Sequence, residues 1–174
     1  MDKDSIADLL EAKHSELISW LEQQPDDAWT EGPEGKWTSG QQVLHLLQSI
    51  KPLNNALSMP RFLLRYKFGK ANRPVREHDA IIKRYQERLA GAKGKTFEGS
   101  KKMKVPTIAD KHFILDRLQV EQKKLQYTTK KISDKNLDTL VLPHPLMGKM
   151  PVREIIMWTA YHVEHHTETL KTNY

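Results

Sequence analysis

The residues of this chain whose types and spacing most clearly suggest chemistry are two histidines near its end, His162 and His166. On a helix, residues four positions apart project from one face, one turn apart. Neutral imidazole is a common ligand of divalent metals, so two rings at this spacing can chelate one ion. The same spacing also occurs in core-edge pairs that contact only backbone carbonyls or water. The pair therefore indicates a candidate metal site, with a purely structural pair as the alternative.

The helix that must carry this pair is predicted over residues 151–171. Pro151 suits the first position of a helix. At about 100° per residue, His162 and His166 lie on one side, beside an apolar arc, while His165 sits on the shoulder of that side. The opposite side carries four charged residues: Arg153, Glu164, Glu168 and Lys171. The two imidazoles are therefore expected to face the interior, and no acidic residue is placed well enough to be named as a general base.

A third ligand must come from elsewhere, and His45 is the candidate. It lies in a second predicted helix that starts near Thr38, where Thr38 and Gln41 have the spacing of a capping box. The apolar positions of this helix form one arc: Val43, Leu46, Leu47, Ile50, Leu53 and Leu57. His45 lies roughly opposite that arc, so it faces either solvent or a polar cavity, and periodicity does not choose between them. Pro52 is expected to kink or end the helix, and Pro60 favours a boundary there.

Two further amphipathic helices are predicted, over residues 4–24 and 108–132. The long connection between the second and third helices is expected to contain a short helix at 80–89 and a flexible stretch around Gly91, Gly94 and Gly99. No strand is expected at 140–142, because Pro143 follows at once and a proline cannot donate to a β-ladder. The sequence therefore predicts an all-α fold, a four-helix bundle with a long second connection, as a single domain over residues 1–174.

Composition and charge limit the classes of function. The chain has 174 residues and no cysteine, which excludes disulfides, thiolate metal sites and cysteine nucleophiles. Its net charge of +6 is concentrated in segment 61–104, which holds fourteen Lys or Arg against four Asp or Glu. Such a segment either attracts an anionic partner or is a solvated basic surface. Nucleic acid is not favoured, because no stacking or recognition motif accompanies the charge. No stretch is apolar enough to span a membrane and the acidic N-terminus is no signal peptide, so a cytoplasmic location is expected.

Three stretches carry a resemblance to the DinB-like superfamily, particularly its second DinB-like group: 36–46 (KWTSGQQVLHL), 142–149 (LPHPLMGK) and 161–166 (YHVEHH). The resemblance covers nearly the whole chain. It implies a four-helix bundle with a three-histidine metal site, in which one ligand comes from a tryptophan-led second helix and two from an H-x-x-x-H pair on the last helix. Carried over position by position, the ligands are His45, His162 and His166. His144 matches a position near the mouth of the site, and we interpret it as a pocket residue rather than a ligand.

The chain departs from the family pattern at two places. Thr169 stands where members often have a glutamine, and Met150 and Pro151 stand where they often have a threonine before the last helix. Neither change removes a ligand, but the first leaves the polar lining of the pocket open. Three other histidines match nothing in the family and are expected at the surface: His14, His78 and His112.

The resemblance implies a divalent metal ion, zinc or nickel before others, and with it a metal-dependent enzyme, either a thiol transferase or a hydrolase. Three neutral ligands leave the charge of the ion undiminished and a coordination position open. The expected substrate is a small molecule, anionic or a low-molecular-weight thiol, and a homodimer is compatible with this reading. The alternative function is that of a non-catalytic binding protein whose basic segment 61–104 contacts nucleic acid or an anionic membrane surface.

Overall fold

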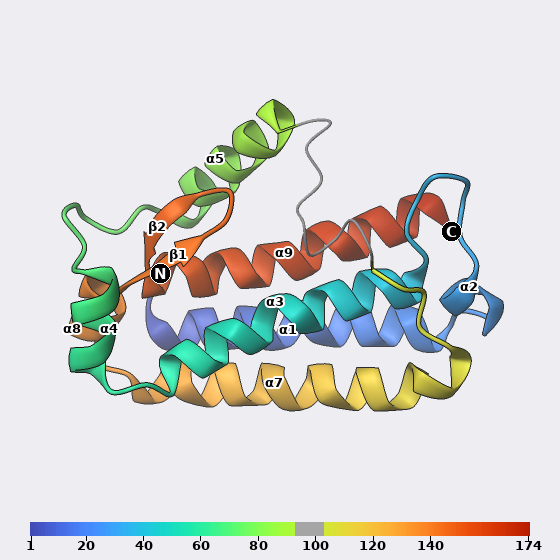
Figure 1. Ribbon diagram of the computed structural model, residues 1–174, viewed down its shortest axis with the longest axis horizontal. Helices are drawn as coiled ribbons and strands as arrows, with labels where there is room; N and C mark the ends of the chain where they lie inside the picture. Colours follow the sequence, from blue (N-terminus) through green and yellow to red (C-terminus); the bar gives the residue numbers. More distant parts are fainter. Residues whose placement is uncertain (93–102) are drawn as a thin grey trace.

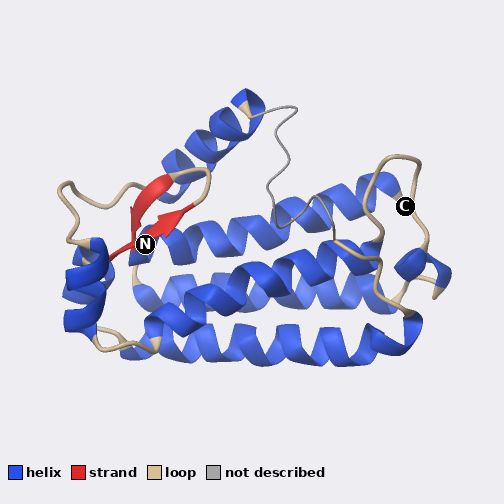
Figure 2. Ribbon diagram, viewed as in Figure 1, coloured by secondary structure: helices blue, strands red, loops and turns tan. Residues whose placement is uncertain are grey.

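The computed structural model describes residues 1–92 and 103–174, so Gly94 and Gly99 of the expected flexible stretch lie outside the described residues. Within these ranges the protein is mostly helical, with one small two-stranded sheet (Figure 2). The all-α prediction is therefore confirmed in its broad form. None of the helices in the described ranges has both the length and the apolar character needed to cross a membrane.

Four long helices in the described part of the chain lie side by side (Figure 1). They are α1 (Lys3–Glu22), α3 (Ser39–Leu57), α7 (Lys111–Lys131) and α9 (Val152–Asn173). α1 packs against α7 and α9, and α3 packs against the same two helices. Their facing sides form one apolar core, in which Leu10, Ile50, Leu118 and Ile156 are almost fully buried. This core fixes α3 and α9, the two helices that carry the candidate metal ligands.

The start of α3 is set by the capping box that the sequence predicts. The hydroxyl of Thr38 accepts a hydrogen bond from the backbone N–H of Gln41 at 3.1 Å, and the Gln41 side chain accepts from the backbone N–H of Thr38 at 3.0 Å. Of the two outcomes expected at Pro52, an end of the helix does not occur, because α3 continues to Leu57. Pro52 and Gln48 are both exposed, so the Gln48 carbonyl that lacks its helical donor is within reach of water.

The expectation of no strand at 140–142 is wrong. β1 (Val141–His144) pairs in antiparallel register with β2 (Gly148–Pro151), with Leu142 opposite Met150 and Pro143 opposite Lys149. A proline is tolerated here because both strands of a two-stranded ladder are edge strands. A residue whose N–H would point away from the partner strand makes no ladder hydrogen bond, so a proline at that position removes none. Gly148 has a φ of 75°, a left-handed conformation that favours glycine where the chain turns back. The hairpin holds His144 beside α9.

The remaining short helices lie in the connections. α2 (Asp27–Thr30) precedes α3, a 3₁₀ turn (Ile108–Asp110) precedes α7, and α8 (Asp134–Thr139) precedes the hairpin. The basic connection contains α4 (Arg61–Phe68), which packs against β1, and α5 (His78–Gly91), which packs against α9. α5 is the short helix predicted at residues 80–89. It brings part of the basic segment to the helix that carries His162 and His166 (Figure 1).

Candidate metal centre

The structure brings the three predicted ligands together. Nε2 of His45 lies 3.2 Å from Nε2 of His162, and Nε2 of His166 lies 3.1 Å from the same atom. The candidate ligand atoms of the three histidines all lie within 4.8 Å of one another. α3 supplies His45 and α9 supplies the other two, so the side of α3 opposite its apolar arc faces α9 and not open solvent. Three imidazoles with ring nitrogens converging in this way are compatible with one shared metal ion.

Burial keeps the three imidazoles neutral. His162 and His166 are 4% and 9% exposed, and His45 is half-buried. Burial, with a smaller contribution from a neighbouring histidine, lowers the pKa of His45 to about 4. Burial also lowers the pKa values of His162 and His166 well below the usual histidine range, and the neighbouring rings lower them further. At neutral pH each ring therefore has a free lone pair, which is the form that binds a metal.

Gln42 fixes the orientation of His166, a role that the sequence analysis did not assign. Its side-chain oxygen lies 2.7 Å from Nδ1 of His166, and Gln42 is 3% exposed. The amide oxygen accepts the Nδ1–H proton, which leaves Nε2 of His166 as the unprotonated nitrogen facing the other two rings. A glutamine three residues before His45 shares its side of the helix, and that spacing is the signal that could have identified it.

Two tryptophans cover the outer faces of the cluster. The ring of Trp37 stacks on His166 with 6.4 Å between centroids and 8° between planes. The ring of Trp158 stacks on His162 with 4.5 Å between centroids and 20° between planes. Both rings restrict the orientation of a ligand histidine and exclude water from one face of it.

The other histidines divide into three groups. His144 lies beside the cluster, with its ring centroid 4.2 Å from that of Trp158, but it is not one of the converging rings. His112 is exposed as expected and His78 is half-buried. The expectation that His14 lies at the surface is wrong: it is 4% exposed, and its Nδ1–H donates to the backbone carbonyl of Leu10 at 2.8 Å. The helix α1 is packed on two sides, and this contact with α7 and α9 encloses His14.

The acids of α9 point away from the cluster, as the helical angles predict. Glu164 pairs with Lys13 at 3.0 Å and Glu168 pairs with Lys171 at 2.9 Å. Among the residues that the structure describes, the group of potential metal ligands contains only the three histidines. The cluster is therefore an all-imidazole donor set.

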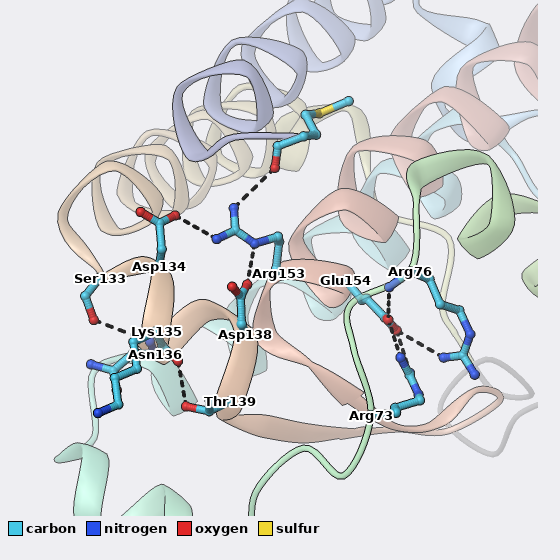
Figure 3. Close-up of polar contacts among 11 residues, drawn as sticks. Arg73, Arg76, Ser133, Asp134, Lys135, Asn136, Asp138, Thr139, Arg153 and Glu154 are labelled. Carbon is cyan, nitrogen blue, oxygen red and sulfur yellow. Dashed lines mark hydrogen bonds and ion pairs between the residues drawn. The ribbon is translucent and has the colours of Figure 1, made fainter.

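Arg153 does not lie on a solvent face with those acids, which corrects the angular prediction. It is 8% exposed, and its guanidinium bonds to Asp138, to Asp134 at 2.7 Å and to the backbone carbonyl of Met1 at 3.2 Å (Figure 3). The two aspartates belong to α8, which packs on the first turns of α9. α8 and the N-terminus thus cover a position that would be exposed on an isolated helix.

Glu154 anchors the basic connection to the start of α9. It is 1% exposed and accepts hydrogen bonds from the Arg73 guanidinium at 2.8 Å, from the backbone N–H of Arg76 at 2.7 Å and from the Arg76 side chain at 3.3 Å (Figure 3). Burial raises the pKa of this carboxyl, but the bonds from Arg73 and Arg76 outweigh burial and hold the pKa below its usual range. Two charges of the basic segment therefore share one buried counter-charge, which offsets one of them.

A cavity of about 610 Å³ opens beside the cluster, between the loop before α3 and the last turns of α9. The residues of its lining that concern the site are Lys36, Trp37, Gln42, His165, His166 and Asn173. The Lys36 ammonium donates to the side-chain oxygen of Asn173 at 2.6 Å across the mouth. The cavity therefore joins solvent to a candidate ligand, and its lining holds both a cationic residue, Lys36, and an acidic one, Glu168.

Comparison with known protein families identifies the fold family of this chain. The sequence model of the DinB superfamily matches residues 9–170, which include all three converging histidines and both tryptophans that cover them. Neither a curated protein nor a solved structure matches the chain. Because the match extends over nearly the whole sequence, the chain belongs to the DinB superfamily.

Proposed function

We propose that this protein is a divalent-metal-dependent enzyme that acts on a small molecule, with His45, His162 and His166 as the metal ligands. The observation that carries the proposal is the convergence of three neutral Nε2 atoms, two of them 3.1 Å and 3.2 Å from the third. Isolated buried nitrogens placed so close together would be costly unless they shared a proton or a cation. Imidazole donors suit zinc or nickel, and we propose one of these.

The donor set fits a catalytic rather than a closed structural site. Structural zinc sites usually have four protein ligands, whereas catalytic sites have three and keep one position open. A divalent ion held here would act as a Lewis acid and lower the pKa of a water or thiol ligand. Gln42 holds the proton of His166 on Nδ1, which keeps Nε2 free to bind the ion. The indole faces of Trp37 and Trp158 exclude water from one face of His166 and of His162.

The cavity beside His166 is the proposed substrate site. Its volume of about 610 Å³ is within the usual range for small-molecule pockets. Lys36 at the mouth can pair with a negative group of an anionic substrate or of a low-molecular-weight thiol, while Glu168 in the same lining is already paired with Lys171. His165 lines the same cavity, and burial lowers its pKa, which favours the neutral ring. Thiol transfer and hydrolysis are the two reactions that this arrangement supports.

Metal analysis of tag-free protein tests the ligand assignment. Wild type should bind about one equivalent of zinc or nickel, and His162→Ala should lose it because only two ligands remain. His165→Ala is the matched control, since His165 is on the same helix and outside the converging group. Circular dichroism shows whether each variant keeps its helices. Equal and negligible metal in all three folded proteins would refute the proposal.

A second function is favoured by the surface of α4. Phe62 and Tyr66 are 70% and 91% exposed and alternate with Arg61, Arg65 and Lys67. An aromatic and basic helix of this kind is suited to nucleic acid or an anionic membrane surface. Binding to single-stranded DNA and to vesicles of phosphatidylserine should then weaken steeply as salt rises. A weak response that does not change with salt would leave α4 as an ordinary solvated surface.

A further inference from the structure

Three aromatic side chains from different elements meet against the ligand His162. Trp158 of α9 stacks on it, His144 of β1 lies edge-on to Trp158 with 4.2 Å between centroids, and Tyr85 of α5 lies 5.6 Å from Trp158 and 6.4 Å from His144. Each of the three is less than a tenth exposed. They form a largely enclosed group next to the metal ligands, and the mechanism proposed above does not use their polar atoms.

The hairpin fixes which nitrogen of His144 carries the proton. Nδ1 of His144 accepts backbone N–H bonds from Leu146 at 3.1 Å and Met147 at 3.0 Å, so it cannot itself be protonated. Burial lowers the pKa of His144 to about 4, so the ring is neutral and its single proton is on Nε2. Within residues 1–92 and 103–174 this Nε2–H makes no hydrogen bond, and unlike Nε1 of Trp158 it is not fully buried. His144 therefore presents a fixed N–H donor.

The indole of Trp158 is a second donor in the same place. Its Nε1 is fully buried and has no hydrogen-bond partner among the described residues. A buried donor without a partner costs roughly 1–3 kcal/mol, so such atoms are rare unless a ligand or water satisfies them. Tyr85 adds no negative charge, because burial raises the pKa of its phenol to about 12. Two neutral N–H donors thus lie on neighbouring rings, one of which is stacked on His162.

We propose that His144 Nε2–H and Trp158 Nε1–H form a binding subsite for a carbonyl or carboxylate oxygen of the substrate. A pair of donors without a nearby acceptor selects an oxygen acceptor and rejects a cation. Preorganised neutral donors of this kind also stabilise negative charge on a carbonyl oxygen. The inference rests on the proposed function only in identifying the ligand as the substrate, and it adds that the substrate is an acid, ester or amide. Neither residue lines the cavity beside His166, so this subsite is on the His162 side of the cluster and takes a part of the substrate that the cavity does not hold.

Nitrogen NMR of the full-length protein, with and without zinc, tests the subsite directly. Acetate and acetamide serve as probes at constant ionic strength, and tetramethylammonium serves as the cation control. The indole signal that is lost in Trp158→Phe and the His144 side-chain signals should shift with both oxygen probes and not with the cation. The indole signals of Trp20 and Trp29 should stay in place, because neither ring contacts His144 or His162.

Two variants remove one donor each and keep the local packing. Trp158→Phe keeps an aromatic ring, and His144→Asn keeps an acceptor for the N–H groups of Leu146 and Met147 but lacks the Nε2 donor. Each should weaken acetate binding by about threefold to tenfold, the effect of losing one net hydrogen bond. Trp20→Phe is the matched control and should bind acetate like wild type, because Trp20 lies against Tyr174, away from the cavity and the histidine cluster.

The results separate the two proposals. Shifts at Trp158 and His144 in zinc-free protein would support the subsite even if metal analysis refuted the metal centre. Unchanged signals at both residues, acetate affinity that is equal in wild type and both variants, or a His144 proton on Nδ1 would each overturn the subsite while leaving the metal ligands as they are.

Discussion

Burial has two different consequences for the histidines of this protein. At His162 and His166 it keeps the rings neutral beside other ring nitrogens, where a cation can satisfy the lone pairs. At His14 it leaves one nitrogen without any partner among the described residues, since Nδ1–H donates to Leu10 and Nε2 is buried without a contact. The first arrangement is suited to binding, whereas the second makes His14 a source of acid sensitivity.

Replacing His14 by leucine should make the protein less sensitive to acid. Burial lowers the pKa of His14 to about 4, below its unfolded value of 6.5, so between these values the unfolded chain binds more protons. Stability is therefore complete above about pH 6.5 and falls as the pH drops toward 4. At about pH 5 the loss from this residue is roughly 2 kcal/mol. Urea unfolding of wild type and His14→Leu at about pH 7 and about pH 5 measures it.

The control for this prediction is His112→Leu, which changes an exposed histidine on α7. It should retain the pH dependence of wild type. If His14→Leu and wild type lose the same free energy of unfolding on acidification, the buried His14 does not titrate as described.

Gln42 should matter for metal affinity although it is not a ligand. Gln42→Leu has nearly the same size but no acceptor for the Nδ1–H of His166, so that ring is free to turn or change tautomer. Loss of such a partner typically weakens metal binding by about 10- to 100-fold. Gln42→Glu keeps an acceptor oxygen and should bind zinc at least as tightly as wild type. Competition with a chelator measures the affinities, and equal affinity in the leucine variant would show that the contact does not orient His166.

At the residue scale, the helical angles predicted the directions of side chains but not what covers them. The angles placed His162 and His166 inward and Glu164 outward, and the structure agrees. They placed Arg153 outward as well, yet α8 and the N-terminus cover it. A periodic pattern describes one helix, whereas the burial of a given position depends on segments distant in the sequence. His14 was misplaced for a different reason: it was expected at the surface because it matches nothing in the family, although its spacing from Leu10 and Leu17 puts it on the buried side of α1.

Among the elements, a buried carboxylate of α9 anchors the part of the basic connection that precedes α5. Glu154 on α9 accepts bonds from Arg73 and Arg76, which lie just before α5. α5 in turn carries Tyr85 to the rings next to His162. The ion pair of Glu154, in the first turn of α9, therefore helps to position the Tyr85 ring. It lies about two helical turns before His162, the first candidate metal ligand on α9.

Removing the charge of Glu154 should loosen this connection. In Glu154→Gln the two arginines lose their counter-charge, but their side chains are 27% and 31% exposed and can be hydrated. We expect a loss of about 2 kcal/mol in the free energy of unfolding, less than for a fully buried pair. Amide hydrogen exchange in residues 70–80 should become faster. Glu87→Gln, at an exposed site of α5, is the control, and equal exchange in both variants would contradict the anchoring role.

Elements whose start is encoded locally were predictable from the sequence. The capping box of Thr38 and Gln41 correctly located the start of α3, because both partners lie within one turn. Two expectations about prolines were wrong: Pro52 does not end α3, and Pro143 does not prevent a strand. Proline breaks a helix or strand because it lacks the N–H for a backbone hydrogen bond. At Pro52 water can bind the carbonyl that loses its partner. At Pro143 the edge strand does not need that N–H. The hairpin depends on pairing and packing with α4 and α9, which local rules do not include.

For the whole molecule, the histidine cluster connects regions that are far apart in the sequence. His45 and His162 are 117 residues apart, and between them lie the basic connection, α7 and the hairpin. In the unfolded chain these imidazoles do not form a preorganised site, so an ion that binds all three stabilises only the folded state. The free energy of metal binding is therefore added to the stability of the packing among all four long helices.

Zinc should raise the stability of the entire protein, and this rise should disappear when any one helix loses its ligand. At about a thousand times the dissociation constant, the gain is roughly 4 kcal/mol, or about 10 °C in Tm for a domain of this size. His45→Ala changes only α3, yet it should abolish the gain as fully as His162→Ala on α9, because two rings cannot hold the ion tightly. His165→Ala should retain it. Thermal unfolding with zinc and with chelator measures each shift. A gain that survives in His45→Ala would mean that the ion binds to α9 alone and does not connect the two halves of the chain.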